Sequence, residues 1–240
     1  SLSTRIKICL EIIMSKLTDL QSLVSKRRES ISGTLETNYS RNYLKLGDFH
    51  NGGYDFDDHV VPYSKSAFNL NAKIMIILQD WASENFLNGP INEVQKRLGH
   101  DPVLPTNRNL FRLLDKFFNL EFSEVYATDV FPFVKSGDMG TKIPMADMVL
   151  AANQFAIPQI KIISPKLVIC LGRQTFNSIR KASGLKEMSL SEPPETNNFS
   201  IGNSIVIGAH HVGGMGTSML GGKLAQEQQW EQIASFFERL

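Results

Sequence analysis

Cysteine is nearly absent from this chain of 240 residues, which has only Cys9 and Cys170. Two cysteines exclude a disulfide framework and a four-cysteine cluster. Cys170 lies in the apolar run LVICLG, where a cysteine usually acts as a small buried hydrophobe. We therefore expect the hydrophobic core alone to hold the fold, and an intracellular, reducing compartment is the simplest interpretation.

Long apolar runs and a strong net charge are also missing. The N-terminal stretch IKICLEIIMSKL contains Lys7, Glu11 and Lys16, so it is too short and too charged to span a bilayer. It also lacks the plain apolar core and the cleavage site of a signal peptide. The net charge of +1 argues against a histone-like mode of nucleic-acid binding, although a local basic groove stays compatible with it.

The first 70 residues predict a helix followed by an irregular segment. Apolar residues recur at three- and four-residue spacing over residues 4–28, and the basic run at 26–28 suits a helix C-terminus. That run is more simply a solvated end than a phosphate contact. Residues 30–70 are rich in Ser, Asn, Gly, Tyr and Asp, with a turn at 51–53 and room for one short strand. The His and Asp residues within 50–59 match no metal-ligand spacing, so we interpret them as a polar loop.

From residue 72 onward, apolar runs alternate with amphipathic stretches. The predicted strands are 73–79, 124–130, 166–172 and 204–210, and the predicted helices are 106–118, 145–163, 174–183 and 223–239. Thr106 is the expected N-cap of the first of these helices, and Pro158 is expected to bend the second. The alternation predicts an α/β fold, a three-layer α/β/α sandwich around a mostly parallel four-stranded sheet. We expect a single domain over 1–240, with an N-terminal helix at 1–30 and an irregular extension at 31–70.

Polar residues leave the predicted strands where ligands bind in open α/β sheets, beyond the carboxyl ends. These residues are Gln79 and Asp80, Thr128 and Asp129, Gly172 and Arg173, and His210 and His211. Asp80 alone could be a turn residue or a helix cap, but here we interpret it as a general base or as a charge that stabilises a cationic sugar. His211 begins HVGGMG, whose glycines permit close backbone approach and unusual dihedral angles. A double histidine with one downstream acid is a poor metal site, so we predict none.

Four motifs, in chain order, resemble the uracil-DNA glycosylase superfamily. The segment 78–82, Leu-Gln-Asp-Trp-Ala, resembles its Gly-Gln-Asp-Pro-Tyr motif, and YATDVFPF (126–133) resembles a second strand that usually ends in a base-reading Asn. PKLVICLG (165–172) is similar to its Pro-Lys-x-Ile-x-x-Leu-Gly strand, and HVGG (211–214) lies where the family has His-Pro-Ser or His-Pro-Gly. The resemblance runs from about residue 72 to 239, and the first 70 residues add nothing to it.

The resemblance implies a role for each matching residue. Asp80 would position water or stabilise an oxocarbenium-like sugar, and His211 would donate a hydrogen bond to the departing base anion. The implied base-binding residues are Gln79, Trp81, Ala82, Asp129 and His210. The candidate DNA contacts are Arg108, Lys135, Arg173, Gly213 and Gly214, although a solvated surface is an equally good interpretation of the three cations.

Departures from the family pattern bear on the base. Trp81 replaces a proline, and Val212 replaces another. Ala82 replaces the Tyr that excludes a 5-methyl group, so a methylated or larger base could fit. Asp129 replaces the Asn, and an ionised carboxylate accepts hydrogen bonds but cannot donate one to O4 of uracil. Either Asp129 has a raised pKa, or the base is not uracil.

The sequence therefore predicts a DNA base-excision enzyme that hydrolyses the N-glycosidic bond of uracil or a related base. No metal or organic cofactor is required, and the iron–sulfur branches of the family need more cysteines than this chain has. The expected partner is DNA, single-stranded or with a flipped-out base; we expect a monomer and no membrane. One alternative is a hydrolase or transferase acting on free nucleosides or nucleotides, and another is a catalytically inactive member that binds nucleic acid or protein.

Overall fold

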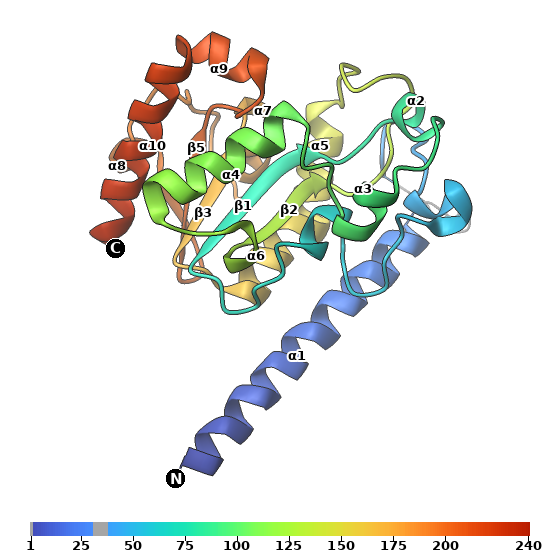
Figure 1. The fold of residues 1–240 in the computed structure, drawn as a ribbon, viewed down its shortest axis with the longest axis horizontal. Coiled ribbons are helices and arrows are strands. Elements are labelled where there is room, and N and C mark those ends of the chain that lie inside the picture. Colours follow the sequence, from blue (N-terminus) through green and yellow to red (C-terminus); the bar gives the residue numbers. More distant parts are fainter. Residues whose placement is uncertain (1, 31–37) are drawn as a thin grey trace.

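The computed structural model describes residues 2–30 and 38–240, so part of the predicted irregular extension, 31–37, lies outside the described residues. Its centre is a five-stranded sheet in the order β2-β1-β3-β5-β4 (Figure 1). The strands are β1 (Ile74–Asp80), β2 (Tyr126–Phe131), β3 (Leu167–Leu171), β4 (Phe199–Ile201) and β5 (Ser204–Ala209). The α/β class and the mostly parallel sheet are thus confirmed, and the sheet has one strand more than predicted.

The extra strand is β4, which pairs antiparallel with β5 at the edge of the sheet. It has only three residues. The other neighbouring strands pair in parallel, and β1 lies between β2 and β3. The chain therefore reverses its order across the sheet between β1 and β3, which is where ligands bind in such folds.

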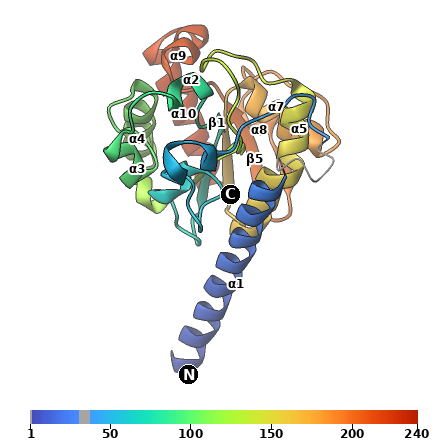
Figure 2. The ribbon, with the colours of Figure 1, turned by 90° about the vertical axis from the view of Figure 1, so that its right-hand side faces the viewer.

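Helices cover both faces of the sheet (Figure 2). The helices are α1 (Leu2–Glu29), α2 (Glu84–Leu87), α3 (Glu93–Leu98), α4 (Pro105–Phe118), α5 (Met145–Ala151), α6 (Ile157–Ile163), α7 (Arg173–Ala182), α8 (Pro194–Asn197), α9 (Gly214–Leu220) and α10 (Lys223–Glu238). α4 and α10 lie on one face, and α5, α6 and α7 lie on the other. The strands between them are buried on both sides, which explains why β1 and β3 are almost continuous apolar runs.

Two local expectations change in detail. Leu104 is the N-cap of α4 and Pro105 is its first residue, so Thr106 lies inside the first turn and does not cap the helix. Proline suits this position because the first helical N–H has no intrahelical partner. The long helix predicted over 145–163 contains a π-helical turn, Ala152–Ala156, just before Pro158. Pro158 has no N–H to donate, so the interruption lies where a regular hydrogen bond would be missing.

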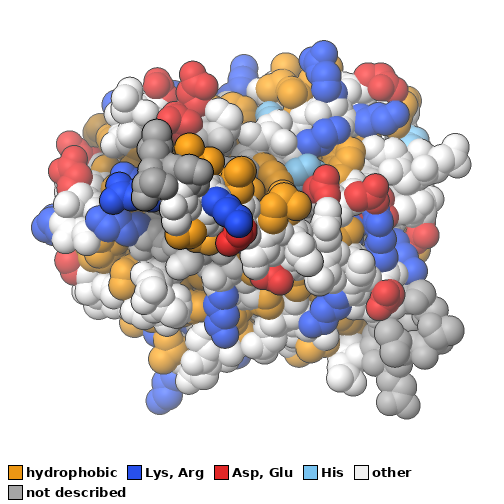
Figure 3. All heavy atoms as spheres, turned by 90° about the horizontal axis from the view of Figure 1, so that it is seen from below, with side chains coloured by type: hydrophobic (Ala, Val, Ile, Leu, Met, Phe, Trp, Pro, Cys, Tyr) orange, Lys and Arg blue, Asp and Glu red, His pale blue; other side chains and the backbone are white. Residues whose placement is uncertain are grey.

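α1 packs on the domain through its second half only. Leu20, Leu23 and Val24 are buried, whereas apolar residues of the first half are about half exposed. Figure 1 shows the first half projecting from the body, and Figure 3 views the face from that side. Acidic, basic and hydrophobic side chains are interspersed over that face. Among the residues described, no helix combines the length and apolarity that crossing a membrane requires.

Near its C-terminus, α1 is joined to the irregular segment that follows it. The Arg27 guanidinium is buried, pairs with Asp55 and donates to the Val60 carbonyl at 2.6 Å. Val60 and Val61 are themselves in the core. The segment from residue 38 to 72 holds short 3-10 helices and isolated bridges, to Val134 and Tyr126, but no named strand.

Candidate functional site

A cavity of about 550 Å³ opens at the carboxyl edge of the sheet, where β1 ends. Asp80 and His211 both line it, although Asp80 is the last residue of β1 and His211 follows β5. Gln79 and Trp81 line it as well. The two residues that the sequence singled out for chemistry are therefore brought together, as the rule for open α/β sheets predicts.

The Asp80 side chain is held at both carboxylate oxygens. Its Oδ2 atom lies 2.9 Å from the Lys135 ammonium nitrogen, and its Oδ1 atom accepts a hydrogen bond of 2.9 Å from the Gln79 side chain. Burial raises the pKa of Asp80 above its usual value, while the Lys135 cation and its hydrogen bond oppose this shift. The carboxylate is thus fixed in orientation inside a largely dry site.

The His211 ring is held in one neutral tautomer. Its Nδ1 atom accepts a hydrogen bond of 3.0 Å from the Gly213 backbone N–H. A nitrogen that accepts carries no proton, so in the neutral ring the proton is on Nε2. Burial lowers the pKa of His211, and the Asp80 charge opposes this shift in part. His211 therefore offers a neutral Nε2–H donor beside the Asp80 carboxylate.

The glycines after His211 serve close packing and not unusual dihedral angles. None of Gly213, Gly214 and Gly216 has a positive φ. A Cβ atom on Gly216 would lie 2.1 Å from the His211 carbonyl oxygen, so only glycine lets α9 pack here. The Val212 carbonyl also accepts a hydrogen bond of 2.8 Å from Asn109 of α4. The predicted close approach is therefore confirmed and the predicted dihedral angles are wrong.

No protein-family model and no curated protein matches this sequence. The likeness to uracil-DNA glycosylases accordingly stays a prediction, which depends on the four motifs and on where their residues lie.

Asp129 is a buried residue of β2 and does not line the cavity. Its side chain is fully buried, and neither carboxylate oxygen has a hydrogen-bond partner among the described residues. Burial, reinforced by the Asp80 charge, raises the pKa of Asp129 well above its usual value. The protonated acid, which can donate a hydrogen bond, is thus the favoured form. Of the two possibilities that the Asn-to-Asp difference left open, the raised pKa of Asp129 agrees with the first, and the identity of the base stays a prediction.

Tyr63, His100 and Asn107 are among the residues of the cavity that were not predicted. The Tyr63 hydroxyl donates to the Asn107 side chain, and its ring stacks on His100 with centroids 6.2 Å apart. All three line the cavity. Tyr63 belongs to the irregular segment that carries no family motif, and no periodicity there indicates a site. Part of the cavity wall therefore comes from the first 70 residues, which add nothing to the family resemblance.

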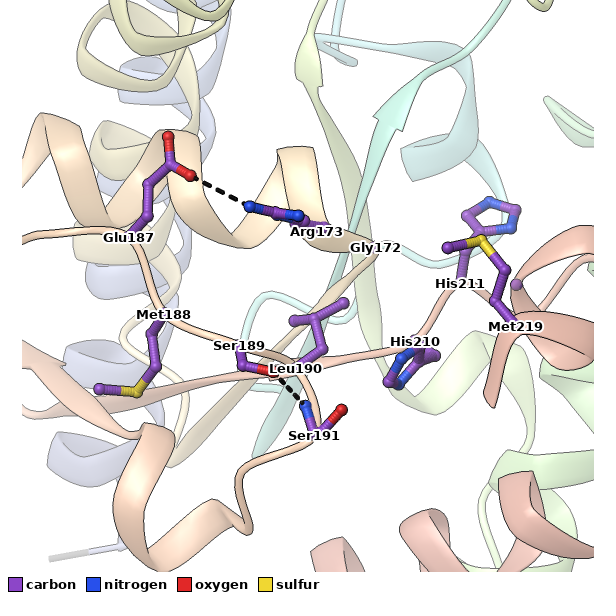
Figure 4. Close-up of a pocket in the computed structure, with 11 residues that line it drawn as sticks. Gly172, Arg173, Glu187, Met188, Ser189, Leu190, Ser191, His210, His211 and Met219 are labelled. Carbon is purple, nitrogen blue, oxygen red and sulfur yellow. Dashed lines mark hydrogen bonds and ion pairs between the residues drawn. The ribbon is translucent and has the colours of Figure 1, made fainter. Parts of the chain in front are cut away.

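Two predicted base contacts lie elsewhere. Ala82 is buried in a small hydrophobic cluster with Leu46, Phe49 and Leu87, so its size does not shape the cavity wall. His210 faces a second cavity of about 470 Å³, which lies beside β3 and β5 and also includes His211. Figure 4 shows the two histidine rings on opposite sides of the chain. Trp81 does line the first cavity, and its indole donates to the Gly99 carbonyl at 2.9 Å.

Some of the predicted DNA-contact residues are exposed at the surface, and others are buried. Arg108 is exposed, and the Arg173 side chain is 78% exposed with its guanidinium 3.6 Å from Glu187 (Figure 4). Lys135 is buried against Asp80, which excludes it from a surface phosphate contact, so that prediction is wrong. Gly214 is exposed at the start of α9, whereas Gly213 is buried.

Within the described residues, no group of three or more His, Cys, Asp or Glu side chains is arranged to hold a metal ion.

Proposed function

We propose that this protein is a DNA glycosylase that hydrolyses the N-glycosidic bond of uracil or of a related deaminated or modified base. The observation that carries the proposal is the shared cavity of Asp80 and His211. Its volume of about 550 Å³ accommodates a nucleobase with its sugar, since small-molecule sites span roughly 300–1,000 Å³.

The charges of the two side chains suit heterolysis of a glycosidic bond. As the bond from C1′ to the base nitrogen lengthens, the base takes the electron pair and the sugar becomes cationic. The Asp80 carboxylate stabilises the cation, and the His211 Nε2–H donates to the base anion. Both groups are oriented before substrate arrives, so little reorganisation is needed in the transition state. Water then adds its oxygen to C1′; one of its protons stays on the new C1′ hydroxyl, and the other passes to the base anion, directly or through solvent.

Aromatic and apolar side chains of the same cavity suit a flat base. Trp81, Tyr63 and His100 contribute rings, and Phe86 and Met215 are exposed apolar residues of its lining. A base stacked in a duplex cannot reach Asp80, so the enzyme acts on a flipped-out or single-stranded nucleotide. Stacking on the aromatic walls would offset part of the cost of unstacking.

The test is base release under single-turnover conditions from oligonucleotides that carry uracil, hypoxanthine, xanthine or methylated uracils. Alkali cleavage at the resulting abasic site reports base loss. We expect Asp80→Asn to lower the rate by orders of magnitude while DNA affinity is kept, and the exposed control Asp115→Asn to leave it unchanged. Equal rates for wild type and Asp80→Asn would remove Asp80 from the mechanism. Turnover of free nucleosides with no release from DNA would instead support the nucleoside-hydrolase alternative.

A further inference from the structure

Lys135 is an unusual neighbour for the proposed catalytic carboxylate because it is as deeply buried as Asp80 itself. The two side chains are 3% and 5% exposed, and the ammonium nitrogen lies 2.9 Å from Asp80 Oδ2. The same ammonium donates to the Met139 carbonyl at 2.7 Å. A lysine with both contacts cannot reach a DNA phosphate outside the protein.

The backbone of Lys135 fixes where this ammonium lies. Its carbonyl accepts a hydrogen bond of 2.9 Å from the Glu84 N–H, and Lys135 forms an isolated parallel bridge with Ser83. The segment after β2 is thereby tied to the segment after β1, which begins beside Asp80. The distance between the cation and the carboxylate is therefore set by the backbone as well as by the side chain.

The other charged or titratable groups around Asp80 do not replace this cation. His211 is favoured in its neutral form by burial, and Asp129 would add a like charge if it ionised. Gln79 contributes a hydrogen bond but no charge. Without Lys135, an ionised Asp80 would be an unpaired buried anion, which proteins avoid by protonation.

We propose that Lys135 is a positioning residue for base excision, which holds Asp80 as an oriented carboxylate facing the substrate sugar. This inference rests on the proposed function. Lys135 acts on Oδ2 while Gln79 acts on Oδ1, so the plane of the carboxylate is set before DNA binds. The role is distinct from DNA binding, since it alters the ionisation of Asp80 and leaves the surface charge pattern untouched.

The deciding experiment compares wild type with Lys135→Met, which keeps the apolar stem and removes the charge. Because a nearby cation lowers a carboxyl pKa by roughly 1–3 units, we expect the Asp80 pKa to rise by about that amount in the variant. The acid limb of the single-turnover rate should move to higher pH by the same amount, with DNA affinity and its salt dependence unchanged. Asp80 itself is followed by NMR with carboxyl-labelled aspartate, its resonance identified by its absence in Asp80→Asn.

A second variant keeps the proposal testable if Lys135→Met does not fold. Lys135→Cys, made in a Cys9→Ser background and alkylated with 2-bromoethylamine, restores an ammonium at nearly the original position. Position 135 is about as buried as Cys170, so Cys170→Ala is added to the background, and the alkylation is done on the urea-unfolded chain before refolding. We expect the unmodified Cys variant to have the shifted acid limb and the alkylated protein to regain the wild-type limb.

The outcomes separate the inference from the proposed function. An Asp80 pKa that stays the same in a folded variant without the cation would overturn the inference, as would an unmoved acid limb in an active enzyme. A loss of DNA affinity with a smaller salt dependence would overturn it too, in favour of a phosphate contact. A raised Asp80 pKa in a protein whose wild type releases no base would support the pairing role and refute the glycosylase proposal alone.

Discussion

Replacing Asp129 by Asn should change how the stability of the protein depends on pH. Asp129 is fully buried, neither of its carboxylate oxygens has a hydrogen-bond partner within the part of the chain that the structure describes, and its pKa is raised well above the usual value. In the unfolded chain, an aspartate titrates near about 3.9. Between that pH and the folded-state pKa, the folded protein binds more protons than the unfolded one. The free energy of unfolding contributed by Asp129 is therefore complete at low pH and falls as the pH rises.

The size of the effect follows from linkage. A difference of one bound proton changes the free energy of unfolding by about 1.4 kcal/mol per pH unit. This slope holds over the pH range that lies above the unfolded-state pKa and below the folded-state pKa of Asp129. Asparagine has nearly the same shape and no ionisation, so Asp129→Asn removes this dependence. We expect the variant to gain stability relative to wild type as the pH rises through this window.

Urea denaturation at pH 5, 6, 7 and 8, followed by tryptophan fluorescence, measures the difference. The free energy of unfolding is plotted against pH for each protein. A constant cost of burying the amide of Asp129→Asn shifts the whole curve of the variant and leaves its slope unchanged. The same exchange at exposed Asp115 controls for the loss of one formal charge. Parallel curves for wild type and Asp129→Asn would refute the reasoning, because Asp129 would then bind no more protons in the folded than in the unfolded state.

Two further predictions concern the residues after β5. His211→Ala should lower the single-turnover rate of base release by roughly 10²–10³-fold, which is the scale of one lost hydrogen-bond donor to a developing anion. His210→Ala should keep a rate near that of wild type, because the His210 ring faces the other cavity. A larger loss of rate for His210→Ala than for His211→Ala would exchange the two roles. Gly216→Ala should lower both the melting temperature and activity, because its Cβ atom would lie 2.1 Å from the His211 carbonyl oxygen, whereas Gly214→Ala has open space. Equal melting temperatures for the two alanine variants would contradict this packing argument.

The sequence predicted those residues of the site that directly follow recognisable apolar runs. Asp80 comes at the end of one apolar run, and His211 follows another. Each run by itself predicts a strand, and the carboxyl ends of parallel strands lie at the same edge of the sheet, so both residues are expected there. The same runs predict the parallel strands. The sequence did not predict β4, because three residues are too few to show the alternation of side chains that is typical of a strand.

The remainder depends on partners that are distant in sequence. Tyr63 enters the cavity through its contacts with Asn107 and His100, and nothing within its own irregular segment indicates them. Lys135 looked like a surface cation because its counterion lies on the neighbouring strand. A lysine buried by an ion pair and a lysine in solvent have the same local sequence signal, so only tertiary structure separates them.

The buried guanidinium of Arg27 makes the N-terminal helix part of the domain that holds the cavity. Arg27 forms an ion pair with Asp55 and donates a hydrogen bond to the Val60 carbonyl. Tyr63, three residues after Val60, lines the cavity. A shortened chain that starts after α1 would still contain Asp80 and His211, yet the segment that brings Tyr63 to the cavity would lose its contacts with Arg27. The boundary of the smallest working unit accordingly lies before Arg27, well upstream of the first residue that resembles a glycosylase motif.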